Sequence, residues 1–250
     1  MMYRTLLTTV AVLAVTSLNA FGDAKDDLTA ALAKAADSPN YSWSTTVEGG
    51  FGAGTTTGKT EKDGYTEVNL AMRNNSIEVY KKGKKAAIKT DSGWKSADEL
   101  TSAPVDAGAR PTPEAMAARQ AQNFQPPLVQ ATTVAKNLEG VKAEADGFSA
   151  DLPEAGAKQM LMFRGRPGGA NAPTPPEPQN AKASVRVWTK DGTITKMQYH
   201  VTGTVSFGGQ DRDIDRTTTT ELKDVGTTKL EVPDEVKKVL DAADAPKPAQ

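Results

Sequence analysis

The side chains best suited to nucleophilic or metal chemistry are nearly absent from this 250-residue sequence, which has no cysteine and one histidine, His200. The absence of cysteine excludes disulfides, thiolate nucleophiles, cysteine-ligated zinc and iron–sulfur clusters. A single histidine excludes metal sites that need two and argues against a histidine-based catalytic triad. His200 lies one residue out of phase with Tyr199 and Val201, so we expect it on the polar face of a strand, in solvent or beside a cross-strand partner.

A run of small residues at 54–60, GTTTGKT, resembles part of a phosphate-binding loop. The first glycine that such a loop requires is replaced by Ala53. The turn at Asp63-Gly64 also leaves no room for the helix whose N-terminus would receive the phosphate. We therefore interpret this run as part of a β-hairpin.

Three aspartates alternate along residues 211–215 with the spacing of a calcium-binding loop. The sixth position of that loop requires glycine but is Arg216, and the twelfth requires a bidentate glutamate but is Leu222. We expect Arg212 and Arg216 to pair with the carboxylates. The pattern is typical of a charged hairpin tip that keeps a sheet edge from aggregating.

Catalysis and nucleic-acid binding have little support in the composition. Glu67, Glu78 and Glu221 fall on predicted strands, and a carboxylate-dependent hydrolase stays a third alternative, but no spacing brings two of them together. The 30 basic and 31 acidic side chains give a formal net charge of -1, without the basic excess that nucleic-acid binding needs. We predict no enzyme, no catalytic residue, no metal, no cofactor and no nucleic-acid partner.

The N-terminus has the order of a secretory signal peptide. A short segment with one positive charge precedes the apolar stretch 6–15, and residues 16–22 are mostly small. The apolar stretch is shorter than the ~20 residues that span a bilayer, and we expect cleavage after Ala20, Gly22 or Ala24. Without cysteine there is no lipoprotein anchor. We therefore expect a periplasmic or secreted protein with no transmembrane segment in the mature chain.

Alternation of apolar and polar residues predicts two groups of antiparallel strands separated by helices. The first group is 41–48, 55–62, 65–73, 76–82 and 84–90, and the second is 183–187, 197–207 and 214–222, with a small hairpin at 143–152. Turn dipeptides such as Asp191-Gly192 join neighbouring strands. Apolar spacing and capping residues predict helices at 26–35, from 96, from 112 to the Pro126-Pro127 break, at 128–138, at 153–163 and at 233–240.

These elements predict one domain. We expect a signal peptide at 1–22, a single half-barrel domain at 23–241 with a flexible loop at 164–179, and a disordered tail at 242–250. The fold class is α+β, a curved antiparallel sheet, or half-open β-barrel, with helices covering its concave face. Gly203 interrupts an apolar row, which suggests sharp curvature or the close approach of another element.

The apolar side of this sheet provides the candidate binding residues. If the helices fill the hollow incompletely, a cavity remains that an apolar ligand could occupy. Aromatic and methionine side chains suit flexible chains. The residues expected to line the cavity are Trp43, Leu70, Met72, Val187, Tyr199, Val201 and Phe207.

The order of elements is familiar from a known group of proteins. A signal peptide, a first helix, a strand beginning Tyr41-Ser-Trp43, a meander, a helical middle and a long C-terminal hairpin follow one another. That hairpin reads WTKDGTITK at 188–196, and the sheet closes with DVGTTKLEVP at 224–233. In these features the chain resembles the LolA/LppX-like bacterial envelope proteins, and it is similar also to uncharacterised exported bacterial proteins.

The resemblance implies a half-open β-barrel capped by helices that carries lipid or the acyl chains of lipoproteins. It further implies an arginine on a strand facing the helices, for which Arg73 and Arg186 are the candidates. The leading hypothesis is a soluble exported binding or carrier protein for a lipid or acyl chain in the cell envelope. The alternative is a non-enzymatic structural or interaction module with a filled core, which acts through contacts with envelope proteins.

Overall fold

The computed structural model describes residues 23–50, 53–72, 75–103, 111–162, 177–207 and 209–242. The predicted signal peptide at 1–22, the loop at 164–176, Arg73 and the tail beyond residue 242 lie outside these ranges. No helix in the described ranges has the length and apolar character needed to cross a membrane. The helices are α1 Ala24–Ala36, α2 Ala97–Ser102, α3 Pro113–Asn123, α4 Pro127–Ala135, α5 Glu154–Leu161 and α6 Asp234–Ala242.

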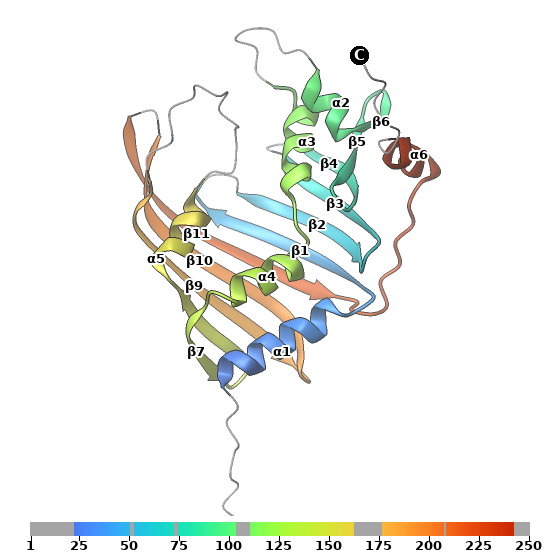
Figure 1. The fold of residues 1–250 in the computed structure, drawn as a ribbon. Coiled ribbons are helices and arrows are strands. Elements are labelled where there is room, and N and C mark those ends of the chain that lie inside the picture. The colour runs from blue at the N-terminus through green and yellow to red at the C-terminus, as the bar shows by residue number, and fades with distance from the viewer. Residues whose placement is uncertain are drawn as a thin grey trace, which may run out of the picture.

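All strands of the described residues form one antiparallel sheet in the order β6-β5-β4-β3-β2-β1-β11-β10-β9-β8-β7. The edge strands β6 and β7 do not pair with each other, so the predicted α+β fold with an open, half-barrel sheet is confirmed (Figure 1). The strands are β1 Asn40–Gly49, β2 Gly54–Glu61, β3 Tyr65–Met72, β4 Asn75–Lys82, β5 Lys85–Thr90, β6 Gly93–Ser96, β7 Glu139–Glu144, β8 Gly147–Leu152, β9 Gln179–Lys190, β10 Thr193–Phe207 and β11 Gln210–Lys223.

The first and last strands meet in the middle of the sheet. β1 pairs with β11 from Ser42 opposite Lys223 to Gly49 opposite Arg216. This pairing joins the meander β1–β6 to the meander β7–β11, which are separated in the chain by α2, α3 and α4. The two apolar faces thereby become one continuous surface.

Local signals explain most element boundaries. The Ser96 hydroxyl accepts a hydrogen bond from the Glu99 backbone N–H at the start of α2, and Thr112 caps α3 in the same way with Pro113 at the first helical position. Two expectations were incomplete: the short strand β6 was not predicted, and β7 begins at Glu139, before the predicted hairpin. Leu230 and Val232 follow the last strand without forming one.

Helices cover the concave face of the sheet, with one exception. α1, α3 and α4 lie along that face in Figure 1, and buried residues such as Leu28 of α1 and Leu128 of α4 join the main core with strand residues. α6 instead covers the opposite face, where Val236 and Leu240 pack on Tyr80 and Ala87. The sheet is therefore covered on both sides at its β4–β6 end.

Small residues bring the helices close to the sheet. The four alanines of α3 at positions 115, 117, 118 and 121 are all buried, as are Ala131 and Ala135 of α4. Because alanine projects only one carbon, the α3 backbone approaches β4 and β5 closely, whereas α4 packs mainly against α1. The main core is consequently continuous from β5 across the sheet to β8.

Gly203 confirms the expectation of a close approach. A Cβ atom at this position would lie 2.5 Å from Leu161 Cδ1 of α5 and 3.0 Å from the backbone oxygen of Gln179. Leu161 packs there with Ala157 and with Val201, Val205 and Ile214 in a second core cluster under α5. Because Gly203 has no side chain, α5 can pack directly on the β9–β11 part of the sheet.

Gly58 of β2 makes the equivalent space for Trp43, and its replacement by alanine tests the packing of the concave face. A Cβ at Gly58 would lie 2.4 Å from Trp43 Cζ2 and 2.4 Å from the Glu67 backbone oxygen. We expect Gly58→Ala to lower the free energy of unfolding by about 1–3 kcal/mol through overpacking, measured by chemical denaturation. Thr57→Ala, which changes the neighbouring exposed position, is the control and should change it by less than about 1 kcal/mol. Equal effects of the two variants would contradict this account of the packing.

Candidate functional site

The residues predicted to line a cavity lie in the packed interior. All the members of this set with described side chains are buried except Met72, which packs at the edge of the main core. Val201 belongs to the second cluster, under α5. The Phe207 side chain lies outside the described residues. In the main core are Trp43, Leu70, Val187 and Tyr199.

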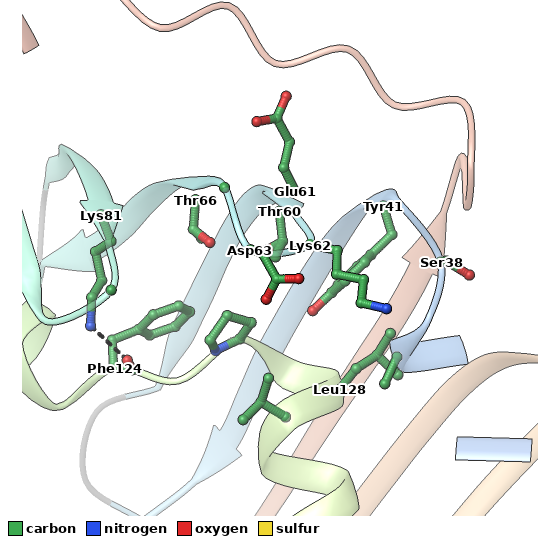
Figure 2. A pocket seen from close by; sticks show the side chains of 15 residues that line it. Ser38, Tyr41, Thr60, Glu61, Lys62, Asp63, Thr66, Lys81, Phe124 and Leu128 are labelled. Carbon is green, nitrogen blue, oxygen red and sulfur yellow. Dashed lines mark hydrogen bonds between the residues drawn. The ribbon is translucent and has the colours of Figure 1, made fainter. Parts of the chain in front are cut away.

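A recess of about 470 Å³ lies beside this core, where the connector from α3 to α4 crosses the ends of β1–β4. Its volume is within the ~300–1,000 Å³ of small-molecule sites. We call it the α4 recess; Figure 2 shows Lys81 and Phe124 near one end and Tyr41 and Ser38 near the other. None of the residues predicted as cavity lining borders it, so their role in ligand binding stays a prediction. The lining is Ala36, Ser38, Tyr41, Thr60, Glu61, Lys62, Asp63, Gly64, Thr66, Lys81, Gly83, Phe124, Pro126, Leu128 and Val129.

One wall of the α4 recess is apolar. Phe124 ends α3 and stacks on Trp43, with ring centroids 5.6 Å apart. Pro126 and Pro127 separate α3 from α4. A proline cannot continue a helix, but it is favoured in the first turn of the next one. Leu128 is buried in the core, whereas the neighbouring Val129 is 48% exposed. The wall thus runs from the core to the solvent.

The opposite wall is a row of polar residues on four adjacent strands. Tyr41 of β1 lies opposite Thr60 of β2, Thr60 opposite Thr66 of β3, and Thr66 opposite Lys81 of β4. All of these residues are buried, and we call them the polar row. The next row inward is apolar and includes Trp43, Val68 and Val79. The apolar concave face therefore ends at the α4 recess in hydrogen-bonding groups.

Hydrogen bonds fix part of the polar row. The Trp43 indole N–H donates to Thr60 Oγ1 at 3.2 Å. Burial raises the pKa of Tyr41 to about 12, although the Thr60 hydroxyl and the Leu128 backbone act in the other direction. Tyr41 is accordingly a neutral phenol at physiological pH, with its hydroxyl beside the first turn of α4.

Lys81 is the charged member of the polar row. Only 6% of it is exposed. Its Nζ donates to the Phe124 backbone oxygen at 2.7 Å and lies 5.8 Å from the centre of the Phe124 ring. Burial lowers the pKa of the ammonium group, and no carboxylate in the described ranges forms an ion pair with it. The position continues the apolar row Ile77–Val79 by the two-residue period of a strand, a signal that sequence reasoning overlooked.

The mouth of the α4 recess carries charges in solvent. Lys62 Nζ lies 2.8 Å from Asp37 Oδ1, and both side chains are well exposed. Glu61 at the end of β2 and Asp63 in the turn between β2 and β3 flank Lys62. Exposed ion pairs of this kind contribute little free energy.

The other face of the sheet has a polar recess, also about 470 Å³, over β7–β11. His200 lies there, as expected from its phase, with Nε2 2.8 Å from Asp215 Oδ1. Thr204 and Ser206 donate to Asp213 and Asp211 in the same way along the β10–β11 hairpin. The aspartate pattern is thus occupied by cross-strand hydrogen bonds, and the described ranges contain no cluster of metal-ligating side chains.

The arginine expectations require correction. Arg186 alternates with Val185 and Val187, so it faces away from the helices, where its Nη2 lies 2.6 Å from Asp146 Oδ1. Arg216 does not pair with the neighbouring aspartates, because strand alternation points it to the opposite face. There its Nη2 donates to the Met160 backbone oxygen of α5 at 2.5 Å. Arg216 is therefore an arginine that a strand presents to a helix.

The carboxylates considered for hydrolysis do not border either recess. Glu67 and Glu78 lie on the adjacent strands β3 and β4, near Tyr80, whose pKa burial and these carboxylates raise to about 12. Glu221 of β11 is three strands from β3, or about 14 Å of sheet.

Comparisons with known proteins find similarity only at the level of structure. No protein-family model and no curated protein matches the chain. Among solved structures, the lipoprotein LppX of Mycobacterium tuberculosis has a TM-score of 0.47 at 8% identity, covering 84% of this chain and 98% of that one. LprF of Mycobacterium bovis has a TM-score of 0.42 at 10% identity, covering 85% and 97%. A LolA superfamily protein of Nitrosomonas europaea has a TM-score of 0.30 at 8% identity, covering 85% and 96%.

LppX and the LolA superfamily protein belong to the group, the LolA/LppX-like proteins, that the order of sequence elements resembles. The likeness concerns the arrangement of the chain. It carries no statement about a ligand of this protein.

Removing the Arg216 side-chain charge tests how α5 is held on the sheet. We expect Arg216→Met to leave the Met160 carbonyl without its charged donor, at a cost of roughly 1–3 kcal/mol in local stability. Amide hydrogen exchange of α5 should accelerate about tenfold or more, while exchange in α1 stays unchanged. Lys223→Met on the same strand, where the lysine is exposed and 3.5 Å from Glu221, is the matched control. Unchanged exchange in α5 would contradict this role of Arg216.

Proposed function

We propose that this chain is an exported binding or carrier protein for an apolar ligand, a lipid or an acyl chain, in the cell envelope. The observation that carries the proposal is the α4 recess, an open volume of about 470 Å³ with one apolar wall that continues into the core through Leu128. The signal-peptide pattern supports export, and the absence of a catalytic motif favours binding over catalysis.

The ligand of this proposal lies along Phe124, Leu128 and Val129. Each methylene group moved from water to such a surface contributes ~0.8 kcal/mol. A chain of eight methylenes in contact would gain about 6 kcal/mol before association losses. The half-exposed Val129 gives the chain a way out toward solvent, which suits a ligand longer than the recess.

The alternative is an interaction module without a ligand. The packed concave face favours it, because the aromatic side chains expected to bind a guest, Trp43 and Tyr199, are already covered by helices. In this case the exposed apolar side chains of the helical face, Met116, Val129 and Met162, would contact an envelope protein.

Native mass spectrometry of the protein purified from its own host separates the two proposals. A carrier should retain lipid that organic extraction releases, and the emptied protein should enhance the fluorescence of a neutral hydrophobic dye. Lipid added back should displace the dye. Neither retained lipid nor a dye response would remove the carrier proposal and leave the interaction module.

Substitution of Val129 tests whether the α4 recess is the binding surface. We expect Val129→Ser to weaken the binding of the dye and of hexadecanol roughly three- to tenfold, since burying a valine is worth ~1.5 kcal/mol and 1.4 kcal/mol is tenfold in affinity. Met116→Ser is the matched control, because Met116 is 44% exposed on α3 but does not line the recess. Equal affinities for the two variants would place the ligand elsewhere.

A further inference from the structure

Lys81 is a buried cation in a protein that gives it no counter-charge within the described ranges. Burial of an unpaired charge is unfavourable, so such groups usually either pair with an opposite charge or mark a site where one binds. The ammonium group has three hydrogen-bond donors. One of them is directed at the Phe124 backbone oxygen, at 2.7 Å. The other two have no hydrogen-bond partner among the described residues, and Lys81 lines the α4 recess.

The start of α4 adds a further donor at the same recess. Its N-cap residue, Pro126, has no side chain that could cap the helix, and Pro127 has no backbone N–H. The first intrahelical bond runs from Gln130 N–H to the Pro126 oxygen. The Leu128 backbone already interacts with the Tyr41 phenol. The N–H group of Val129 therefore remains in the first turn without an intrahelical acceptor, where the helix dipole favours negative charge. Both residues line the α4 recess.

A purely structural role explains only part of this arrangement. The bond from Lys81 to Phe124 satisfies a carbonyl at the C-terminal end of α3 and holds the connector to α4. An exposed lysine could provide the same bond while keeping its charge in water. The structural role leaves unexplained why the charge is buried at the edge of an open recess.

We propose that Lys81 and the first turn of α4 bind the single anionic group of an amphipathic ligand whose apolar chain lies along Phe124, Leu128 and Val129. The proposal rests on the proposed function and specifies its ligand as an acyl chain ending in a carboxylate or a comparable monoanion. Thr60 and Thr66, which lie between Tyr41 and Lys81 in the polar row, supply hydroxyl groups along the same wall.

The charges at the mouth limit the number of negative charges on the ligand. Asp63 would repel an anion, but it lies in the exposed turn, where water and salt screen it. Glu61 is the half-buried last residue of β2, and its carboxylate points away from Lys81 and Phe124 (Figure 2). Lys62 is engaged with Asp37. A single negative charge beside the buried Lys81 is attracted by the ammonium group more strongly than the carboxylates at the mouth repel it. A group with several negative charges would be larger and would place some of them closer to these carboxylates, where the repulsion is stronger.

The test compares two ligands that differ in the head group alone, hexadecanoate and 1-hexadecanol, each displacing a neutral dye from the full mature protein at pH 8. We expect the wild type to bind hexadecanoate at least about tenfold more tightly, since charge-assisted hydrogen bonds are worth more than neutral ones. Lys81→Met should abolish this preference and leave the affinity for hexadecanol within about twofold. Lys82→Met is the matched control, because Lys82 is next on β4 but faces Tyr65 on the opposite side; it should keep the preference.

The outcomes separate the two proposals. If neither ligand binds, the proposed function fails and the head-group proposal fails with it. If both bind the wild type equally well, or if Lys81→Met keeps the preference for hexadecanoate, the head-group proposal is overturned while the carrier proposal stands.

A measurement on the wild type covers the case in which Lys81→Met does not fold. In an NMR spectrum of the lysine side chains, the Lys81 Cε–Hε signal should shift on addition of hexadecanoate and stay in place with hexadecanol. The Lys82 signal should stay in place with both. A Lys81 signal that responds equally to the two ligands would overturn the proposal.

Discussion

The close packing of small helix residues on the concave face of the sheet determines where a ligand can lie. Alanines of α3 place this helix against β3 and β4, where Leu70 and Val79 are fully buried, and α4 packs beside α1. A curved sheet with a single apolar face must be covered by something, and here the chain covers most of it with its own helices. Space for a guest is therefore found at the end of the sheet.

The α4 recess follows from two features of the chain that meet at this end. The consecutive prolines 126 and 127 separate α3 from α4 and leave an uncapped first turn. The strands β1–β4 end their apolar rows in the polar row from Tyr41 to Lys81. The result is an amphipathic recess, with a helix start and aromatic packing on one side and hydroxyl and ammonium groups on the other.

Much of the fold could be predicted from the sequence, whereas the site could not. Two-residue alternation and turn dipeptides such as Asp191-Gly192 predicted the long strands, because these signals are local. The apolar character of Trp43 and Tyr199 predicted burial, but a side chain covered by a helix and one that binds a guest have the same sequence pattern. The polar row becomes visible only with the strand register, since it joins residues 41, 60, 66 and 81 from four strands. The direction of Arg216, by contrast, follows from its alternation with Asp215, a local signal that the expected pairing with the aspartates overlooked.

Intermolecular NOEs between the isotope-labelled protein and unlabelled hexadecanoate test the central claim most directly. The account predicts contacts from the acyl chain to the Val129 and Leu128 methyl groups and to the Phe124 ring, at the α4 recess. Contacts to Trp43, Leu70 and Tyr199 would contradict it, because they would show that the helices lift from the concave face to admit the ligand beneath them.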